Sequence, residues 1–381
     1  MRRSRFVFWG LTALSAGLVL SGCEVFQTST DASSASAGTG QTQDIPSAID
    51  TFSAPPPPDT GFGEIIAHVD VDFAEDLVQI GNTVLVAAKS TGLLVFDVSN
   101  PAAPTEVTRL FAGGDDVWDL ATDSDGRAYV AHYESGVHVL QVTGNTVTAL
   151  GSHAPGWRVI SVAPLGNRLY IGGGDGTRGV LAVLDIANPA SPSPLGSFQF
   201  DQMTSACSSL AARDTTVFCG RADGHLIAFD ASNPAEPVVI GDFFEPGTPG
   251  HEPWGLGITL LGNTLYYADW GAGMLVVDTT NPQAMTALHT YANNHAIYDV
   301  ALGQDVTIRE KSYGRVAYVG GDMGIDVLDV TDPSKTTLIE NVPTRWELDD
   351  SAHGVVFDPA SGYGYVADNK EQSLTVIRLV D

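Results

Sequence analysis

The chain is short of basic residues: it contains 18 Lys and Arg against 45 Asp and Glu. No Lys or Arg occurs between Arg5 and Lys89. The phosphates of nucleic acids and anionic lipids are held by clustered Lys and Arg, which this composition does not supply. The charge balance therefore disfavours binding to nucleic acids or anionic lipid headgroups, and it favours solubility and neutral or cationic partners.

Familiar catalytic signatures are also missing. The sequence has no Gly-x-Ser-x-Gly elbow of the kind that presents a catalytic serine. The run Gly172–Gly176 falls between two expected strands rather than before a helix, so it does not suit a phosphate cradle. No apolar pattern of helical period follows the first 22 residues. We therefore assign no catalytic residue from the sequence, and we expect an all-β binding module rather than an enzyme.

A short phrase returns seven times along the chain. Its fullest form is Gly92–Pro101, which reads Gly-Leu-Leu-Val-Phe-Asp-Val-Ser-Asn-Pro. Further copies lie at Asp185–Pro189, Asp230–Pro234, Asp278–Pro282 and Asp329–Pro333, with degenerate copies at Gly136–Val142 and Ser373–Val380. The spacing of roughly 45 to 50 residues is typical of a propeller blade or another repeat array.

Each repeat reads as four antiparallel strands. Runs such as Asp119–Ala121 and Ala128–Ala131 are rich in apolar, β-branched and aromatic residues, and Asp-Gly or Gly-Asn turns separate them. The phrase itself supplies the third strand and then a turn, in which the Asp side chain binds nearby amides and Pro presets the backbone. We expect this capping role for the recurring aspartates Asp97, Asp185, Asp230, Asp278 and Asp329.

The two ends of the repeat region indicate how the array closes. The last copy stops at Asp381 after its third strand, so its outer strand is missing. Residues Glu64–Asp70 have the character of that strand and precede the first blade. We predict that they complete the seventh blade and close the ring, which removes the exposed sheet edge. The predicted fold is a seven-bladed β-propeller with four-stranded blades.

The phrase resembles the LVIVD repeat, which occurs in bacterial and archaeal surface propellers. The best matches are Leu93–Pro101, Val183–Pro189 and Ile325–Pro333, whereas the second and seventh copies lack the Asn/Asp-Pro turn. The resemblance covers about residues 64–381, which is nearly all of the chain after the first 63 residues. It implies a propeller at the cell surface, and the family has no general catalytic motif to carry over.

The N-terminus carries an export signal. Arg2, Arg3 and Arg5 precede the apolar stretch Phe6–Leu20, which describes a secretory signal peptide over residues 1–22. The sequence Leu20-Ser21-Gly22-Cys23 resembles a bacterial lipobox, which implies cleavage before Cys23 and its acylation with fatty acids such as palmitate. Several acyl chains anchor a protein durably in a membrane. Because Glu24 rather than Asp follows the cysteine, we expect an outer-membrane lipoprotein.

A tether separates the anchor from the repeats. After Cys23 the composition turns to Ser, Thr, Ala, Gly and Gln and ends in Pro55–Pro58. Such a segment buries too little apolar surface to offset its ordering entropy, so residues 23–63 are predicted to be a disordered spacer. Loss of residues 1–22 removes three arginines and no acid, which leaves a net charge of −30. The propeller domain is expected over residues 64–381.

Two cysteines fall within the repeats. Cys207 and Cys219 lie on the expected first two strands of the fourth blade, nearly opposite each other across a turn near Arg213. In an oxidising compartment this placement favours a cross-strand disulfide. A pair of buried free thiols is the alternative.

Candidate ligand-binding residues gather in the expected links between blades. In a propeller these links share one face with the turns between second and third strands. Four histidines from four blades fall in or just after such links, and aromatic and charged residues accompany them. The candidate set is His153, His251, His295, His353, Trp118, Trp254, Tyr298, Arg158 and Glu252.

Three interpretations of this set remain open. The histidines bind loop carbonyls while the Trp rings fill wedges between blades; or the face binds a protein or a glycan; or the imidazoles hold a transition metal such as zinc, copper or iron. The third would suit a lyase or hydrolase at one end of the central channel, although no His-x-x-x-His motif is present. We favour a monomeric, lipid-anchored binding or scaffold module without a cofactor.

Overall fold

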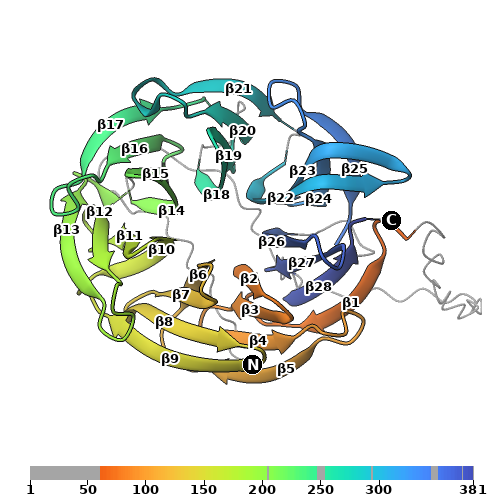
Figure 1. Cartoon of the computed structure of the whole chain (residues 1–381), viewed down its shortest axis with the longest axis horizontal. Coiled ribbons are helices and arrows are strands. Elements are labelled where there is room, and N and C mark those ends of the chain that lie inside the picture. Colours follow the sequence, from red (N-terminus) through yellow and green to blue (C-terminus); the bar gives the residue numbers. More distant parts are fainter. Residues whose placement is uncertain are drawn as a thin grey trace, which may run out of the picture. The chain divides into compact units, whose positions relative to one another are not determined.

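The computed structural model describes residues 61–203, 206–246, 254–292, 295–344, 351–370 and 372–380. They form seven four-stranded antiparallel sheets arranged in a ring around a common axis (Figure 1). The predicted all-β, seven-bladed propeller is confirmed. A short 3-10 turn, η2 (Pro282–Ala284), precedes the strand that follows it in the chain. The predicted signal peptide, Cys23 and almost all of the tether lie outside the described residues.

In each of the first six blades the strands follow one another outward from the axis in chain order. Blade one contains β2 (Asp76–Ile80), β3 (Thr83–Ala87), β4 (Leu93–Asp97) and β5 (Thr105–Leu110). Blade two contains β6 (Val117–Thr122), β7 (Arg127–His132), β8 (Gly136–Thr143) and β9 (Thr146–His153). Blade three contains β10 (Arg158–Leu165), β11 (Arg168–Gly174), β12 (Gly179–Asp185) and β13 (Ser193–Gln199).

The second half of the ring repeats this order. Blade four contains β14 (Cys207–Arg213), β15 (Thr216–Arg221), β16 (Leu226–Asp230) and β17 (Val238–Phe243). Blade five contains β18 (Gly255–Leu261), β19 (Thr264–Asp269), β20 (Gly273–Asp278) and β21 (Thr286–Tyr291). Blade six contains β22 (Ile297–Ile308), β23 (Lys311–Gly321), β24 (Gly324–Asp329) and β25 (Thr337–Val342). Blade seven contains β26 (Ala352–Asp358), β27 (Tyr363–Asp368), β28 (Ser373–Arg378) and β1 (Ile65–Asp70).

The ring closes through its two chain ends, as the sequence predicted. β1 pairs antiparallel with β28, with His68 opposite Thr375 and Asp70 opposite Ser373. Figure 1 shows β1 as the outermost strand of a sheet whose other three strands come from the C-terminus. The last blade is therefore completed by β1, the first described strand, and its sheet has four strands.

The predicted capping role of the repeated aspartates is confirmed. In the first copy the Asp97 carboxylate accepts a hydrogen bond from the backbone N–H of Ser99 at 2.8 Å. The same bond recurs two residues on from Asp185, Asp230, Asp278 and Asp329. Each copy thus ends the third strand with an Asx turn, which satisfies backbone groups that the strand leaves unpaired.

The apolar core lies between neighbouring blades. Leu85 and Val95 of blade one, for example, pack against Val117, Val130 and Leu140 of blade two, and all five are buried. Similar clusters occur at the other junctions. Because each sheet buries both faces against its neighbours, the third strands read as continuous apolar runs rather than alternating ones.

One feature of blade six was not foreseen from the sequence. β22 and β23 form a hairpin that extends well past its counterparts, and its end packs Val306, Ile308 and Tyr313 against Phe62. Phe62 is 2% exposed, and the neighbouring Gly63 donates its N–H to the carbonyl of Arg378 at 2.7 Å. The chain is therefore held against the propeller just before β1 begins.

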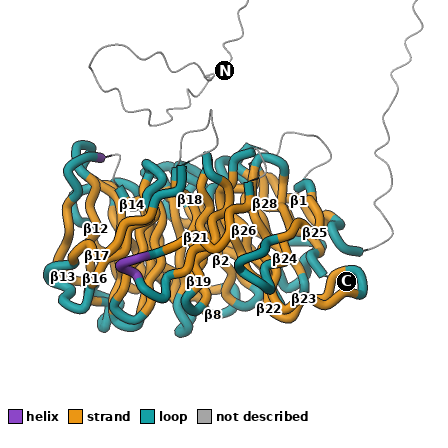
Figure 2. The backbone as a smooth tube through the Cα atoms, turned by 90° about the horizontal axis from the view of Figure 1, so that it is seen from above, coloured by secondary structure: helices purple, strands orange, loops and turns teal. Residues whose placement is uncertain are grey.

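The strands run between two rims of loops, which Figure 2 shows from the side. We call the mouth face the rim that carries the links between blades and the turns between second and third strands, such as residues 111–116 and 133–135. Those candidate ligand-binding residues that the structure describes belong to this rim or to the strand ends beside it. No helix in the described part of the chain is long and apolar enough to cross a membrane.

Candidate functional site

In six of the seven blades, a β-bulge in the innermost strand sets one residue apart at the mouth face. In six blades the register shifts by one residue near the start of that strand. A bulge leaves its extra residue outside the regular pairing and re-aims its side chain. The residues at this position are Trp118, Ile160, Ser208, Leu256, Tyr298 and His353, and Glu75 precedes the corresponding Asp76 in blade one.

Glu75 is the centre of a paired network where blades seven and one meet. Its carboxylate forms an ion pair with Lys89, and it lies 2.8 Å from Nδ1 of His353. The amide of Asn369 donates to its other oxygen at 2.7 Å. Burial acts to raise the pKa of Glu75, but His353 and Lys89 outweigh it and hold this pKa below its usual value. The carboxylate is therefore ionised and fully partnered.

The network continues into blade six through stacked rings. The imidazole of His353 lies on the Tyr298 ring, with centroids 4.1 Å apart and planes inclined by 22°. The Tyr298 hydroxyl donates to Asp322 at 2.7 Å. Burial and the neighbouring Asp322 carboxylate raise the pKa of Tyr298, so its hydroxyl stays protonated and acts as a donor.

On the other side the network passes through blade two to blade three. The Lys89 ammonium lies over the Trp118 ring, 4.9 Å from its centroid, and Trp118 lies 5.8 Å from the ring of Tyr133. The guanidinium of Arg158 lies over the Tyr133 ring, 5.2 Å from its centroid, and is 3.5 Å from the Glu134 carboxylate. We call this continuous set the belt: Glu75, Lys89, Trp118, Tyr133, Glu134, Arg158, Tyr298, Asp322, His353 and Asn369.

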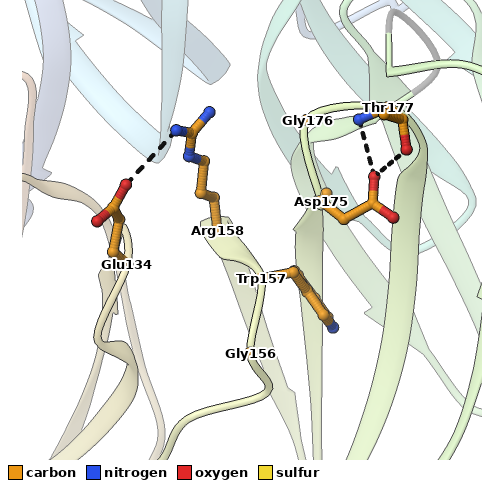
Figure 3. Close-up of a pocket in the computed structure, with 8 residues that line it drawn as sticks. Glu134, Gly156, Trp157, Arg158, Asp175, Gly176 and Thr177 are labelled. Atoms are coloured by element: carbon orange, nitrogen blue, oxygen red, sulfur yellow. Dashed lines mark hydrogen bonds and ion pairs between the residues drawn. The ribbon is translucent and has the colours of Figure 1, made fainter.

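A pocket opens at the end of the belt, between blades two and three. It has a volume of about 510 Å³ and is lined by Glu134, Gly156, Trp157, Arg158, Gly174, Asp175, Gly176 and Thr177. Figure 3 shows Arg158 extended toward Glu134 on one side, with Trp157 and Asp175 on the other. The pocket thus offers one cation, two carboxylates and an indole.

Asp175 is anionic in this pocket. One of its oxygens accepts hydrogen bonds from the Thr177 hydroxyl at 2.6 Å and from the N–H groups of Thr177 and Arg178. These bonds lower its pKa to about 2. The bonded oxygen is used by the turn, which fixes the orientation of the carboxylate at the pocket wall.

Below the mouth face, side chains on the innermost strands join consecutive blades. Three half-buried aspartates each accept a hydrogen bond from a backbone N–H of the next blade: Leu120 to Asp76 at 2.7 Å, Val162 to Asp119 at 2.7 Å and Val355 to Asp299 at 3.0 Å. Desolvation by the surrounding blades raises the pKa of Asp119 to about 7 and that of Asp299 to about 6. Desolvation and the charges of the other two raise the pKa of Asp76 as well.

The structure brings together four of the residues selected from sequence. Trp118, Arg158, Tyr298 and His353 all belong to the belt. His295 instead lies 3.6 Å from Asp326 of β24, and His153 ends the outer strand β9, where burial lowers its pKa. His251 and Glu252 lie outside the described residues. Among the residues that the structure describes, no three His, Cys, Asp or Glu side chains are grouped so that they could hold a metal ion.

Sequence reasoning missed the partners that complete the belt. Lys89, Tyr133, Glu134 and Asn369 lie in or beside the turns that follow second strands, whereas the predicted set came from the links between blades and the strand ends beside them. Lys89 carried a usable signal, since it is the first basic residue after Arg5. A second missed group is the contact of His132 with His138, whose ring nitrogens are 3.1 Å apart; burial lowers the pKa of His138 to about 4.

Cys207 and Cys219 are joined in a disulfide between β14 and β15, with Cα atoms 5.2 Å apart. Both residues are fully buried at the junction with blade three. A bulge between Cys207 and Ser209 shifts the register, so Cys219 stands opposite Leu210 and reaches Cys207 diagonally. The bond lies beneath the mouth face of blade four.

Four segments of the chain match the LVIVD repeat: residues 73–110, 158–199, 256–293 and 304–344. They correspond to blades one, three, five and six. The unmatched blades two and seven are those whose phrase lacks the Asn/Asp-Pro turn, whereas blade four retains Asn233-Pro234 and still is not matched. No curated protein matches the chain by sequence.

Several solved structures align with this chain over most of its length. A chain of the mitotic checkpoint complex aligns with a TM-score of 0.62 at 13% identity, covering 91% of this chain and 99% of that one. U3-55K aligns with a TM-score of 0.61 at 13% identity, over 83% and 98% of the two chains. The computationally designed Ika8 protein aligns with a TM-score of 0.55 at 13% identity, over 83% and 99%.

At 13% identity these likenesses concern the fold alone. The repeat matches and the sheet topology agree with each other, because each matched segment runs from the innermost strand of a blade to its outer strand. The chain is a seven-bladed β-propeller that carries four LVIVD repeats.

Proposed function

We propose that this protein is a binding module of the bacterial cell envelope, anchored by lipid at Cys23, which holds a glycan or protein ligand on its mouth face. The observation that carries the proposal is the belt and the pocket at its end. Rings and charged groups from five blades are fixed there by stacking and ion pairs before any ligand arrives. Side chains that are already ordered lose little conformational entropy on binding, so such a face favours affinity.

The chemistry of the pocket suits a ligand with both apolar and polar surface. Trp157 supplies flat apolar area, while Arg158, Glu134 and Asp175 supply donors and acceptors around it. Recognition sites typically combine rigid aromatic area with a small number of placed polar groups. The loops that carry these groups lie on a framework held by inter-blade packing, so they can differ between repeats without loss of the fold.

The binding proposal is tested with Trp157→Ala and Arg158→Ala in the full-length protein. Wild type and variants are applied to one array of oligosaccharides and one array of purified envelope proteins. We expect at least one specific signal that both substitutions reduce tenfold or more. Leu338→Ala, on the outer strand β25 with Leu338 51% exposed, is the matched surface control and leaves the signal unchanged. Equal signals for all four proteins, or none at all, would refute the proposal.

The anchor is a separate part of the proposal and has its own test. Support comes from the sequence Leu20-Ser21-Gly22-Cys23 and from the disulfide, which suits an oxidising compartment. Cys23→Ala should move the protein from the membrane fraction to the soluble fraction and abolish labelling by an alkynyl palmitate analogue. Membrane association that survives this substitution would remove the lipid anchor from the account.

A second candidate function is an acid–base enzyme, a lyase or hydrolase, centred on His353. The observation that favours it is the contact of Nδ1 with the Glu75 carboxylate, which orients the imidazole and leaves Nε2 to exchange a proton with a ligand. The test is a screen of chromogenic glycosides, esters and uronate polymers. Turnover that is lost in His353→Gln and shows a pH–rate profile would establish this function, and no turnover on any of them would exclude it.

A further inference from the structure

Two turns at the mouth face of blades four and five carry carboxylates that are not fully paired. Asp223 lies in the turn between β15 and β16, and Asp269 ends β19 just before the turn to β20. This sector lies across the ring from the meeting of blades seven and one, where the Glu75 network is centred (Figure 1). Buried polar atoms in native proteins nearly always have a partner, so exceptions call for a physical explanation.

Asp269 is the sharper exception. The residue is 1% exposed. Its Oδ1 accepts hydrogen bonds from the N–H groups of Gly271 at 2.9 Å and Ala272 at 2.7 Å, which shape the turn. Its Oδ2 is buried and has no hydrogen-bond partner. Burial raises the pKa of this carboxyl to about 6, in contrast to the lowered pKa of Glu75.

Asp223 repeats the pattern on the neighbouring blade. Its Oδ2 is paired with Arg221, while its Oδ1 is enclosed and has no partner. Tyr267 connects the two acids: its hydroxyl donates to the carbonyl of His225 at 3.3 Å, and burial together with the charges of Asp269 and Asp223 raises its pKa. Asp223 and Asp269 therefore belong to one local cluster around Tyr267, at the junction of blades four and five.

An unpaired donor completes the cluster. Trp254 lies beside this turn, because its carbonyl accepts a hydrogen bond from the N–H of Trp270 at 2.9 Å. The indole Nε1 of Trp254 is buried without a partner. Near the same turns the Phe244 ring, 43% exposed, stacks on His225 with centroids 4.6 Å apart.

The unpaired atoms restrict the chemistry of what could satisfy them. Carboxylate oxygens only accept hydrogen bonds, and an indole N–H only donates one. An ammonium group has no acceptor for the indole, and a carboxylate or phosphate has no donor for the two acids. Arg221 already places a cation beside Asp223, which disfavours a second one. A hydroxyl group donates and accepts, and hydroxyl bonds to a carboxylate are short and strong.

We propose that Asp223, Asp269 and Trp254 form a subsite for a neutral, hydroxyl-rich ligand, that is, a carbohydrate. Neighbouring sugar hydroxyls donate to the two carboxylates, and one of them accepts from the Trp254 indole. The exposed Phe244 ring provides an apolar surface for a sugar face. This inference rests on the proposed binding function and names the ligand class for one sector of the mouth face.

The test uses the full-length protein in detergent micelles and isothermal titration calorimetry. The probes are neutral hexasaccharides of glucose, mannose, xylose and N-acetylglucosamine, with a glucosamine hexamer and a galacturonate trimer as charged comparisons. We expect at least one neutral probe to bind and both charged probes to bind at least tenfold more weakly. Asp269→Asn and Asp223→Asn should each weaken the neutral probe tenfold or more, and Trp254→Phe severalfold.

Two controls keep this test decisive. Asn at position 269 can still accept from Gly271 and Ala272, so thermal melting should show that the variant is folded. Asp214→Asn, at an 89% exposed position in the turn between the first two strands of blade four, should not change affinity. No binding by any neutral probe, or binding that neither Asp variant changes, would mean that internal water satisfies these atoms, and the inference would be wrong.

The outcome also separates this inference from the binding function on which it rests. If array signals fall with Trp157→Ala and Arg158→Ala while no neutral sugar binds, the mouth face binds something else and only the carbohydrate subsite fails. If a sugar binds and depends on Asp269 but the pocket variants change nothing, the subsite stands and the pocket between blades two and three is not the contact. Loss of both signals overturns both proposals.

Discussion

Two sectors of the mouth face treat their carboxylates in opposite ways. In the belt, Glu75 is bonded to Lys89, His353 and Asn369, and Asp322 accepts from Tyr298. In blades four and five, Asp223 and Asp269 each keep one enclosed oxygen without a partner. Carboxylates at the same rim of the same fold thus have all their hydrogen-bond partners within the protein in one sector and lack some of them in the other.

This difference in carboxylate pairing indicates that one sector holds side chains in position and the other is suited to contact a ligand. A paired carboxylate holds its neighbours in position, and its loss leaves other charges exposed to desolvation. An unpaired buried carboxylate destabilises the free protein and gains most from a ligand, because it has no internal bond to break first. The belt therefore fixes geometry, and the sector of blades four and five is where a ligand contributes the missing hydrogen bonds.

The largest expected effect comes from loosening the blade that carries Asp223. The disulfide of Cys207 and Cys219 spans 12 residues, and a loop of that order contributes about 3 kcal/mol to the free energy of unfolding. We expect Cys207→Ala with Cys219→Ala to lower that free energy by about this amount in urea denaturation. Reductant should lower the free energy of unfolding of the wild type by the same amount and leave that of the double variant unchanged. A change in the double variant on adding reductant would contradict this prediction.

The next effect breaks the belt itself. Lys89→Met removes the cation from Glu75, whose side chain is only 9% exposed. Loss of one partner from such a pair leaves a poorly solvated charge, and we expect about 2 to 3 kcal/mol of destabilisation in urea. Because the Lys89 side chain is 22% exposed, the value stays below that of a fully buried pair. A loss under 0.5 kcal/mol, within the range of ordinary surface substitutions, would show that the belt is not held by this ion pair.

A smaller effect concerns the aspartates that join the blades. Their pKa values are raised in the folded state, so the folded protein binds more protons than the unfolded chain between pH 4 and 7. Stability from this source is present at low pH and falls as pH rises through about 6 to 7. We expect a loss of about 2 kcal/mol between pH 5 and 8 for Asp119, measured by urea denaturation at each pH.

The matched variant for this effect is Asp119→Asn, whose side chain can still accept from Val162. Its stability should depend less on pH than that of the wild type, with the largest gain at pH 8. If the wild type were instead more stable at pH 8 than at pH 5 by a margin that Asp119→Asn abolishes, the direction of the Asp119 shift would be wrong.

The sequence predicted the blades because their information is local. Asp97 and its repeats form Asx turns two residues away, and Glu64–Asp70 is a strand-like run placed just before the first blade, so caps and closure could be read directly. The contacts of the belt could not be predicted from the sequence, because the directions of the Trp118, Tyr298 and His353 side chains depend on β-bulges that no residue pattern marks. The predicted gathering of histidines assumed that residues in equivalent links point alike, whereas His295 and His353 have separate partners.

The most direct test of the account replaces one carboxylate in each sector by its amide and compares the free energies of unfolding at pH 8. Glu75→Gln weakens a paired network and should destabilise the protein by about 2 kcal/mol. Asp269→Asn removes a charge that burial disfavours and should stabilise the ligand-free protein by about 1 kcal/mol. Opposite signs are the predicted result. If Asp269→Asn is as destabilising as Glu75→Gln, then Asp269 is satisfied within the protein and the distinction between the two sectors is lost.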